Sequence, residues 1–321
     1  MLLFSEKESN PMEKTATVGI DIGGAHTKVG LFSCDRGLVR KCWIDNRDKS
    51  RNQIREETSS LILSWKKEFP DYLIKGIGIG CPGRINSQKG VVLYSNNLKR
   101  KNYPRKEIRE KRTGLKVRIT NDANAALLGE AVYGKAKGRK NAVLLTLGTG
   151  LGSGILVDGK IREGKDGTGA EIGHRILYRN GRTCTCGRKG CAERYASATG
   201  LILDALDLKE KFPDSPIYND LNIKTVISFA SKDMAAKEAL DHYLDDLKEV
   251  IININILFRP QAVLLGGGVA DFSSFFLPQL KKKTNKDSSG FEKGHKTEIR
   301  VAKRKNNAGI YGASALWGLD I

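Results

Sequence analysis

The spacing of apolar residues along the chain predicts a mixed α/β protein. Residues 15–33 and 141–159 each form an apolar strand, a glycine-rich turn and a second strand. Further apolar runs predict strands at 38–44, 73–80, 115–120, 261–269 and 298–303. Stretches of good helix formers predict helices near 51–69, 121–134, 191–205, 233–258 and 308–319. Strands and helices therefore alternate, as in α/β folds.

The turns of the two strand–turn–strand segments contain more glycine than a simple connection needs. The first contains Gly23 and Gly24, and the second reads GTGLGSG from Gly148 to Gly154. Glycine allows backbone N–H groups to approach an anion closely and to form a concave nest. Because one such turn opens each half of the chain, the sequence predicts that two domains together hold the phosphates of a nucleotide.

Length and composition predict a soluble globular protein of two domains. The chain has 321 residues, and no apolar run reaches the roughly 18 to 20 residues that a membrane span needs. Residues 1–14 are expected to form a flexible tail rather than a signal peptide. Cys34, Cys42 and Cys81 lie in apolar surroundings and are expected to be buried free thiols. We therefore expect a cytoplasmic protein with no membrane partner.

The net charge of +19 raises nucleic acid as a partner. The excess is concentrated in residues 98–112 and 281–305. Neither stretch has interleaved aromatic residues or a recognisable nucleic-acid-binding module. We expect solvated helix faces and, over 281–296, a polar mobile loop. No nucleic-acid partner is predicted, although the charge would attract anionic substrates.

The segment from Gly169 to Glu193 combines metal-ligand and substrate-binding chemistry. Cys184, Cys186, Cys191 and His174 are the ligand types of a closed zinc site, which would be structural because no position stays open for water. An unmetallated thiol cluster with a packed histidine is the alternative. Glu171 lies one helical step before His174, so the two side chains can face one pocket.

The order and spacing of eight motifs resemble those of the ROK family, which comprises repressors, open reading frames and kinases. The motifs are DIGGAHTKVG, PG at 82–83, NDANAA, GTGLGSG, GAEIGH, CTCGRKGCAE, LLGGGV and AGIYGA, spread over residues 16–318. The resemblance implies a two-domain actin-like ATPase fold, of the ribonuclease H-like class, with a cleft between the domains. The expected smaller domain comprises 15–121 plus 305–321, and the larger one 122–304.

The resemblance also implies a role for individual residues. Asp122 corresponds to the catalytic base, although taken alone it would be read more simply as a helix N-cap. The residues that correspond to sugar contacts are Gly83, Asn97, Asn121, Asp122, Glu171, His174 and Glu193. The first phosphate motif comprises Asp21, Gly23, Gly24, Thr27 and Lys28, with Asp21 on the magnesium side. The second comprises Gly148, Thr149, Gly150 and Gly152, and the adenosine motif comprises Gly266, Gly267 and Gly268.

These roles predict an ATP- and magnesium-dependent kinase acting on the 6-hydroxyl of a hexose, most simply glucose. N-acetylmannosamine, N-acetylglucosamine and fructose are alternative substrates, because residues 99–103 depart from the family's usual pattern beside the sugar. Polyphosphate is an alternative donor. A transcriptional regulator without its DNA-binding module, and an actin-like ATPase without a sugar substrate, are the remaining alternatives. A homodimer is expected because relatives commonly form one.

Overall fold

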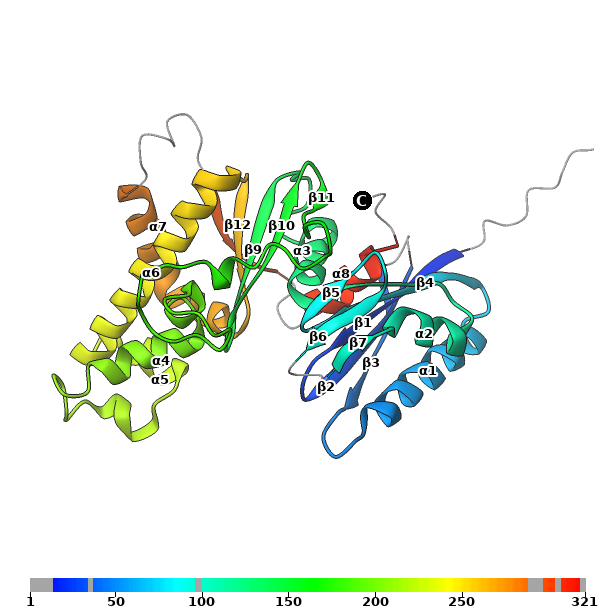
Figure 1. Ribbon diagram of the computed structural model, residues 1–321, viewed down its shortest axis with the longest axis horizontal. Helices are drawn as coiled ribbons and strands as arrows, with labels where there is room; N and C mark the ends of the chain where they lie inside the picture. Colours follow the sequence, from blue (N-terminus) through cyan, green and yellow to red (C-terminus); the bar gives the residue numbers. More distant parts are fainter. Residues whose placement is uncertain (1–13, 34–36, 96–99, 288–296, 304–306, 318–321) are drawn as a thin grey trace, which may run out of the picture. The chain divides into compact units, whose positions relative to one another are not determined.

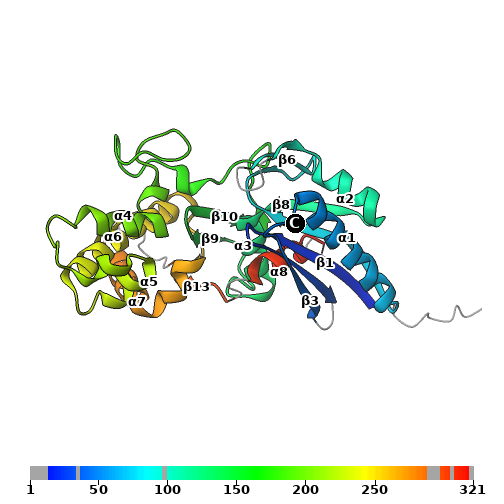
Figure 2. The ribbon, with the colours of Figure 1, turned by 90° about the horizontal axis from the view of Figure 1, so that it is seen from below.

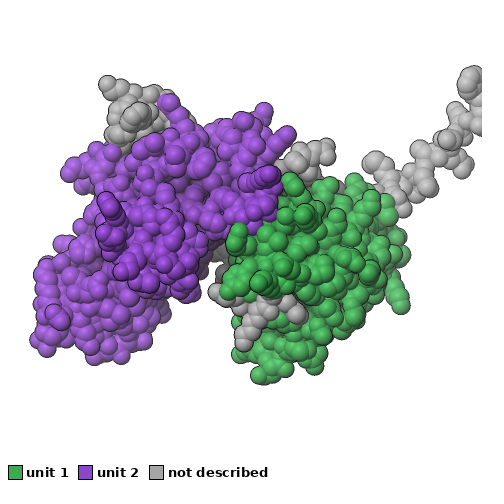
Figure 3. All heavy atoms as spheres, in the orientation of Figure 1, with its two compact units in different colours: residues 1–122, 309–320 green, residues 123–308, 321 purple. Residues whose placement is uncertain are grey.

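The structure is a computed structural model that describes residues 14–33, 37–95, 100–287, 297–303 and 307–317. It divides into two compact units. Unit 1 comprises residues 1–122 and 309–320, and unit 2 comprises residues 123–308 (Figure 3). The chain therefore passes from one unit to the other twice, at the first turns of two helices. The tail predicted at 1–14 lies outside the described residues except for Lys14, which begins a strand.

Unit 1 is built on a five-stranded sheet of order β3-β2-β1-β4-β8 (Figure 1). Its strands are β1 (Lys14–Ile22), β2 (His26–Ser33), β3 (Gly37–Asp45), β4 (Tyr72–Cys81) and β8 (Val117–Asn121). β1, β2 and β3 are antiparallel, whereas β1, β4 and β8 are parallel. A small antiparallel sheet adds β5 (Arg84–Asn86), β6 (Val91–Ser95) and β7 (Arg100–Tyr103).

Helices cover both faces of the main sheet of unit 1. Side chains alternate between faces along a strand, so Val18 and Ile20 of β1 pack with Ile62 and Trp65 of α1 (Arg51–Glu68). α2 (Arg105–Thr113) lies beside α1 in both ribbon views (Figures 1 and 2). The opposite face is covered by α8 (Ala308–Ala315).

α8 approaches the sheet backbone to backbone, which requires glycine on the strands below it. A Cβ atom on Gly19 of β1 would lie 2.0 Å from the carbonyl oxygen of Ile310. A Cβ atom on Gly78 of β4 would lie 1.7 Å from that of Ala313. Real Cβ atoms are never this close to a carbonyl oxygen, so any side chain at these positions would displace the helix.

Unit 2 repeats this plan with a sheet of order β11-β10-β9-β12-β13. Its strands are β9 (Ala142–Leu147), β10 (Leu151–Val157), β11 (Lys160–Ile161), β12 (Ala262–Gly266) and β13 (Glu298–Val301). Its helices are α3 (Asp122–Tyr133), α4 (Ala198–Asp207), α5 (Ile223–Phe229), α6 (Met234–Phe258) and α7 (Ser273–Lys286). Four 3₁₀ turns are η1 (Ile172–His174), η2 (Ala192–Arg194), η3 (Pro216–Asp220) and η4 (Gly268–Phe272).

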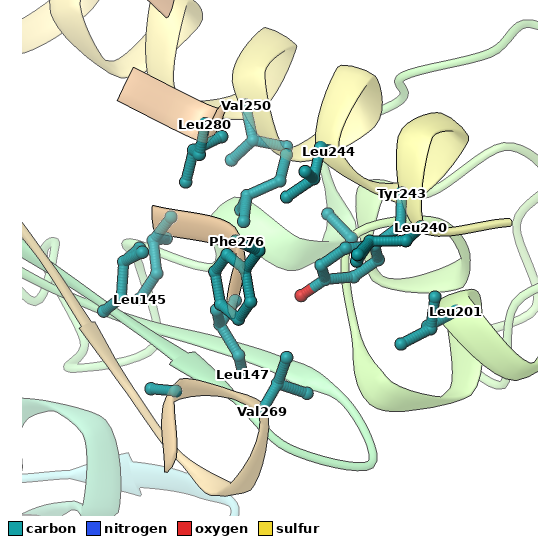
Figure 4. Packing of buried hydrophobic residues seen from close by; sticks show 14 of the residues in the cluster. Leu145, Leu147, Leu201, Leu240, Tyr243, Leu244, Val250, Val269, Phe276 and Leu280 are labelled. Atoms are coloured by element: carbon teal, nitrogen blue, oxygen red, sulfur yellow. The ribbon is translucent and has the colours of Figure 1, made fainter. Parts of the chain in front are cut away.

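The larger core of unit 2 lies between its sheet and α4–α7. Leu145 and Leu147 of β9 point toward Phe276 of α7 and Leu244 of α6, and all four side chains are fully buried (Figure 4). The other face of the sheet packs against Leu127 of α3. The chain that links the two units therefore also covers one face of this sheet.

Every strand and helix predicted from the sequence is present, with shifted ends. α4 begins at Ala198, later than expected, because the cysteine-rich loop and η2 occupy 184–194. The loop predicted at 281–296 is wrong in its first part, since α7 continues to Lys286; residues 288–296 lie outside the described residues. The helix face expected in 98–112 is not fully solvated, because Arg109 of α2 is buried. No helix in the described ranges is long and apolar enough to cross a bilayer.

Candidate active site and metal centre

Two carboxylates of unit 1 lie at the carboxyl ends of parallel strands. Asp21 is the penultimate residue of β1 and pairs with Gly80 of β4, which in turn pairs with Thr120 of β8. Asp122 directly follows β8 and begins α3, with its side chain exposed. The carboxyl ends of parallel strands are the usual place for ligands in such sheets. Asp122 is also close enough that its charge raises the pKa of Asp21.

Asp21 is held in a partly buried position by α8. Burial raises the pKa of Asp21 to about 6, while Lys28, whose ammonium is 4.0 Å from the carboxylate, acts in the opposite direction. A Cβ atom on Gly309 would lie 2.4 Å from the Asp21 Cγ atom. The first turn of α8 therefore touches this carboxylate, which a divalent cation could neutralise.

The first glycine turn is fixed by a residue that the sequence did not single out. The Asn46 side chain donates a hydrogen bond to the Gly23 carbonyl oxygen (2.9 Å) and accepts one from the Thr27 hydroxyl (3.1 Å). The Asn46 backbone N–H donates to the Ala25 carbonyl oxygen (2.8 Å). Thr27 is therefore buried against Asn46, while Gly24 stays exposed. Asn46 directly follows β3, and its partner across the turn cannot be read from the sequence.

The other predicted sugar contacts of unit 1 also lie near strand ends. Gly83 has φ +114°, and a Cβ atom there would lie 2.4 Å from the Tyr94 carbonyl oxygen, so the turn requires glycine. Asn121 is the last residue of β8 and is partly buried. Asn97 lies outside the described residues.

The second glycine turn, Gly148–Gly152 of unit 2, is held by the start of α4. The Ala198 N–H donates to the Gly148 carbonyl oxygen (2.8 Å), and the Thr199 hydroxyl donates to the Thr149 carbonyl oxygen (2.7 Å). These bonds fix the direction of two peptide planes in the turn, while the Thr149 side chain stays exposed. Thr199 was not predicted from the sequence.

Glu193 supports the same turn from the other side. Its Oε2 atom accepts a hydrogen bond from the Leu151 N–H (3.2 Å), and a Cβ atom on Gly150 would lie 2.3 Å from it. Its Oε1 atom lies 3.7 Å from the Cys184 Sγ atom. Glu193 therefore links the phosphate turn to the cysteine cluster, a contact that its predicted sugar-binding role did not include.

The cysteine cluster has the geometry of a tetrahedral metal centre. Ligand atoms of His174, Cys184, Cys186 and Cys191 all lie within 4.8 Å of one another. The Cys186 and Cys191 Sγ atoms are 3.6 Å apart, and Cys184 Sγ is 3.7 Å from His174 Nδ1. Four ligands around zinc, with Zn–S bonds of about 2.3 Å, are separated by about 3.8 Å. The donor set and its spacing therefore fit zinc. Of the other predicted thiols, Cys81 is buried, Cys42 is only partly buried, and Cys34 lies outside the described residues.

The loop that contains Glu171 and His174 is anchored to the second glycine hairpin. The Ser153 hydroxyl of β10 donates to the Ala170 carbonyl oxygen and accepts from the Ile172 N–H (3.0 Å). Gly173 packs so closely that a Cβ atom would lie 2.0 Å from the Leu151 carbonyl oxygen. Glu171 is exposed, and His174, at the end of η1, is partly buried in the cluster. One rigid assembly thus joins the phosphate turn, the cluster and the loop.

The predicted adenosine motif lies at the end of β12, the strand between β9 and β13 in unit 2. Gly266 ends β12 and is buried, whereas Gly267 and Gly268 are exposed. Gly267 has φ +83°, and a Cβ atom there would meet the Leu147 carbonyl oxygen at 2.6 Å. Around an added Cβ atom at Gly268, nothing lies within 4 Å. The backbone at Gly268 is thus open to a flat ligand.

Comparisons with known proteins agree with this arrangement. A protein-family model described as the ROK family matches residues 17–319. A glucokinase of Thermotoga maritima is 33% identical over 282 residues, covering 85% of this chain and 88% of its own. An N-acetyl-D-glucosamine kinase of Aliivibrio fischeri is 30% identical, with coverages of 93% and 98%. The solved ROK glucokinase of Streptomyces griseus, in complex with glucose and AMPPNP, superimposes with a TM-score of 0.76 at 27% identity, with coverages of 94% and 98%. The expected actin-like fold class is confirmed.

Proposed function

Because the chain belongs to the ROK family, we propose that it is an ATP-dependent kinase that phosphorylates the 6-hydroxyl group of a hexose. Glucose is the first candidate, since the Thermotoga maritima and Streptomyces griseus relatives are named glucokinases. The observation that supports the chemistry most directly is the pair Asp21 and Asp122, placed at the carboxyl ends of parallel strands in one unit. No DNA-binding activity is needed to explain these groups.

In the proposed reaction, Asp122 acts on the sugar and Asp21 on the nucleotide side. The Asp122 carboxylate accepts the proton of the 6-hydroxyl as that oxygen bonds to the terminal phosphorus of ATP. The bond between this phosphorus and the bridging oxygen breaks, and ADP leaves with both electrons of that bond. A positioned carboxylate suffices for this proton transfer. Asp21 would help to hold the magnesium ion that neutralises the phosphate charge.

In this proposal, the glycine turns bind the nucleotide and the polar side chains bind the sugar. The turns at Gly23–Gly24 and Gly148–Gly152 would hold phosphate groups through backbone N–H donors. The open backbone at Gly268 would admit the adenine base. Gly83, Asn97, Asn121, Glu171, His174 and Glu193 would contact the sugar. Hydroxyl groups both donate and accept, so a set of amides, carboxylates and one imidazole complements them.

We further propose that the Cys₃His cluster holds a structural zinc ion. Zinc would fix the loop from Glu171 to Glu193, and through Glu193 the second phosphate turn. Four protein ligands leave no position for a reacting water molecule, so the ion's contribution is to stability and positioning. A cytoplasmic location suits its free thiols and a nucleotide substrate. A homodimer, commonly found among relatives, can be tested by light scattering.

Initial rates across a panel of sugars would test the proposed function. The panel should contain glucose, fructose, mannose, N-acetylglucosamine and N-acetylmannosamine, each with ATP and magnesium and, separately, with polyphosphate. We expect the highest kcat/KM with glucose and ATP. A higher kcat/KM with an N-acetylhexosamine would support the same reaction with a different sugar as substrate. Absence of phosphorylated product with every sugar, despite ATP binding, would refute the kinase.

A further inference from the structure

A cavity in unit 1 is lined by cationic side chains and by no carboxylate. It has a volume of about 350 Å³ and lies among the first glycine turn, α1, β7 and α2. Its cationic lining residues are Lys49, Arg51, Arg55, Arg105 and Arg109. Gly23 and Gly24 of the first phosphate turn also line it. Ile22, which also lines it, packs in the core beneath α1, whereas the neighbouring Asp21 touches α8. The cavity is thus on the opposite face of the sheet from Asp21.

Arg109 is the most deeply buried cation of this cavity. It is only 3% exposed, and its guanidinium donates to the Arg55 carbonyl oxygen (3.0 Å) and to the Ser59 hydroxyl (2.6 Å). Neither acceptor carries a charge. Burial lowers the pKa of Arg109 to about 10, and the nearby Arg105 and Arg55 add to this effect. A buried guanidinium without a counter-charge is costly, which indicates that an anion from outside completes the site.

Arg105 and Arg55 are arranged around a single aromatic ring. The Arg105 guanidinium lies 5.4 Å from the centre of the Tyr103 ring, and the Tyr103 hydroxyl accepts a hydrogen bond from Arg55 (3.0 Å). The Nε atoms of both arginines are buried and lack a hydrogen-bond partner among the described residues. Guanidinium groups held in this way are suited to the planar, bidentate recognition of phosphate oxygens.

Two carboxylates pair with Lys49 and Arg55, which line the cavity. Glu57 pairs with Lys49 at 2.6 Å, and Glu56 lies 3.5 Å from Arg55 while also pairing with Arg112. Within the part of the chain that the structure describes, neither Arg105 nor Arg109 forms an ion pair. The cavity also receives the N-terminus of α1, whose partial positive charge favours anions. Among the described residues, the guanidinium groups of Arg105 and Arg109 therefore lack a carboxylate partner.

We propose that this cavity, which adjoins the first phosphate turn at Gly23 and Gly24, is an additional anion site that binds a small phosphate-bearing anion through Arg105, Arg109 and Arg55. The ligand chemistry is that of a phosphoryl group with several oxygens, from either inorganic polyphosphate or a sugar phosphate. This inference does not depend on the proposed kinase activity, because binding can be measured without sugar or ATP.

Titration calorimetry on the full chain would test the site with tripolyphosphate, glucose 6-phosphate and orthophosphate as separate probes. We expect tripolyphosphate or glucose 6-phosphate to bind the wild type, and the better of the two identifies the source. Arg105→Gln should weaken this binding roughly tenfold or more, because it removes a charge-assisted contact. Arg105→Lys keeps the charge but loses the planar guanidinium. Its affinity for the anion should therefore lie between those of the wild type and Arg105→Gln.

Arg47→Gln is the matched control for a loss of charge in the same unit. Arg47 is largely exposed, pairs with Asp45 and does not line the cavity. Its replacement should change the affinity less than twofold, in line with screening of exposed charges. The proposal would be overturned if the wild type binds none of the three anions, or if Arg47→Gln and Arg105→Gln weaken binding equally. Circular dichroism would establish that each variant is folded, and Arg105→Lys remains informative if Arg105→Gln is not.

Discussion

The two sheets of the molecule have the same strand order but carry different chemistry at the same place. In unit 1, Asp21 pairs with Lys28 on the hairpin and with Gly80 on the parallel strand. In unit 2, Thr146 holds the corresponding place and pairs with Gly152 and Gly266. At this equivalent position, unit 1 thus has a partly buried carboxylate and unit 2 has a hydroxyl. The comparison indicates that a repeated backbone plan can carry different polar groups at equivalent positions of its two copies.

The helices that cover the two sheets, α8 and α3, also differ in how closely their backbones approach the strands. α8 lies so close to its sheet that side chains are excluded from Gly19 and Gly78. α3 leaves slightly more room above the second sheet, where a Cβ atom on Gly154 would lie 2.9 Å from the Ala123 carbonyl oxygen. The tighter contact is in the unit whose helix also touches the proposed magnesium-side carboxylate. The helix that packs more closely on its sheet, α8, is therefore also the one that confines the Asp21 carboxylate.

Of the substitutions considered, Asp122→Asn should reduce turnover the most, because Asp122 of unit 1 is the proposed base. We expect kcat to fall about 10²- to 10⁴-fold with little change in the KM for hexose, since the amide still contacts the hydroxyl but accepts no proton. Steady-state kinetics with glucose and ATP would measure this. Asp71→Asn, which changes an exposed carboxylate in the same unit, is the control. A kcat within threefold of the wild type would remove Asp122 from this role.

The stabilities of Gly78→Ala and Gly154→Ala would compare the contact of α8 with its sheet and that of α3 with its sheet. The first places a methyl group against a backbone oxygen at 1.7 Å, and the second meets its nearest atoms at 2.9 Å and 3.1 Å. We expect about 3 kcal/mol of destabilisation for Gly78→Ala and about 1 kcal/mol for Gly154→Ala. Differential scanning calorimetry would give both values. Equal shifts in the melting temperature would show that the contact of α8 is no tighter than that of α3.

Asp21→Asn should stabilise the protein at alkaline pH. The folded-state pKa of Asp21 is raised from 3.8 to about 6, so the folded state binds this proton more tightly than the unfolded state. Its contribution to stability is therefore greatest below pH 3.8 and declines as the pH rises toward 6. Above that range the ionised group costs up to about 3 kcal/mol, which Asn would not. Melting temperatures with EDTA should accordingly differ more at pH 8 than at pH 5, and Thr146→Val serves as the control in unit 2.

Cys184→Ser tests whether recognition depends on the cluster of unit 2. We expect loss of bound zinc and a KM for hexose raised roughly tenfold, with a smaller change for ATP. Elemental analysis by mass spectrometry and steady-state kinetics would measure these effects. Cys42→Ser removes a thiol of unit 1 outside the cluster and should change neither. Wild-type protein that contains no zinc after purification without chelators would contradict the metal assignment.

Sequence reasoning was most successful where a local pattern determines the structure. The strands, the two glycine turns and the Cys₃His cluster each have such a pattern, and the structure contains all of them. It failed where the structure depends on a contact between residues that are far apart in the sequence. Arg109 lies in a run of charges that reads as solvated, yet α1 covers it. Asn46 and Thr199 act across turns that only the folded chain brings near them.

The contact between Gly309 and Asp21 has a consequence for biosynthesis. Residues 123–308 of unit 2 are continuous in the chain, so this unit can fold as soon as they leave the ribosome. Unit 1 begins earlier but needs α8, whose backbone covers Gly19 and Gly78 and confines the Asp21 side chain. Nascent chains that stop before residue 309 would thus lack the backbone that covers Gly19 and Gly78 and confines the Asp21 side chain, so unit 1 would complete its core after unit 2.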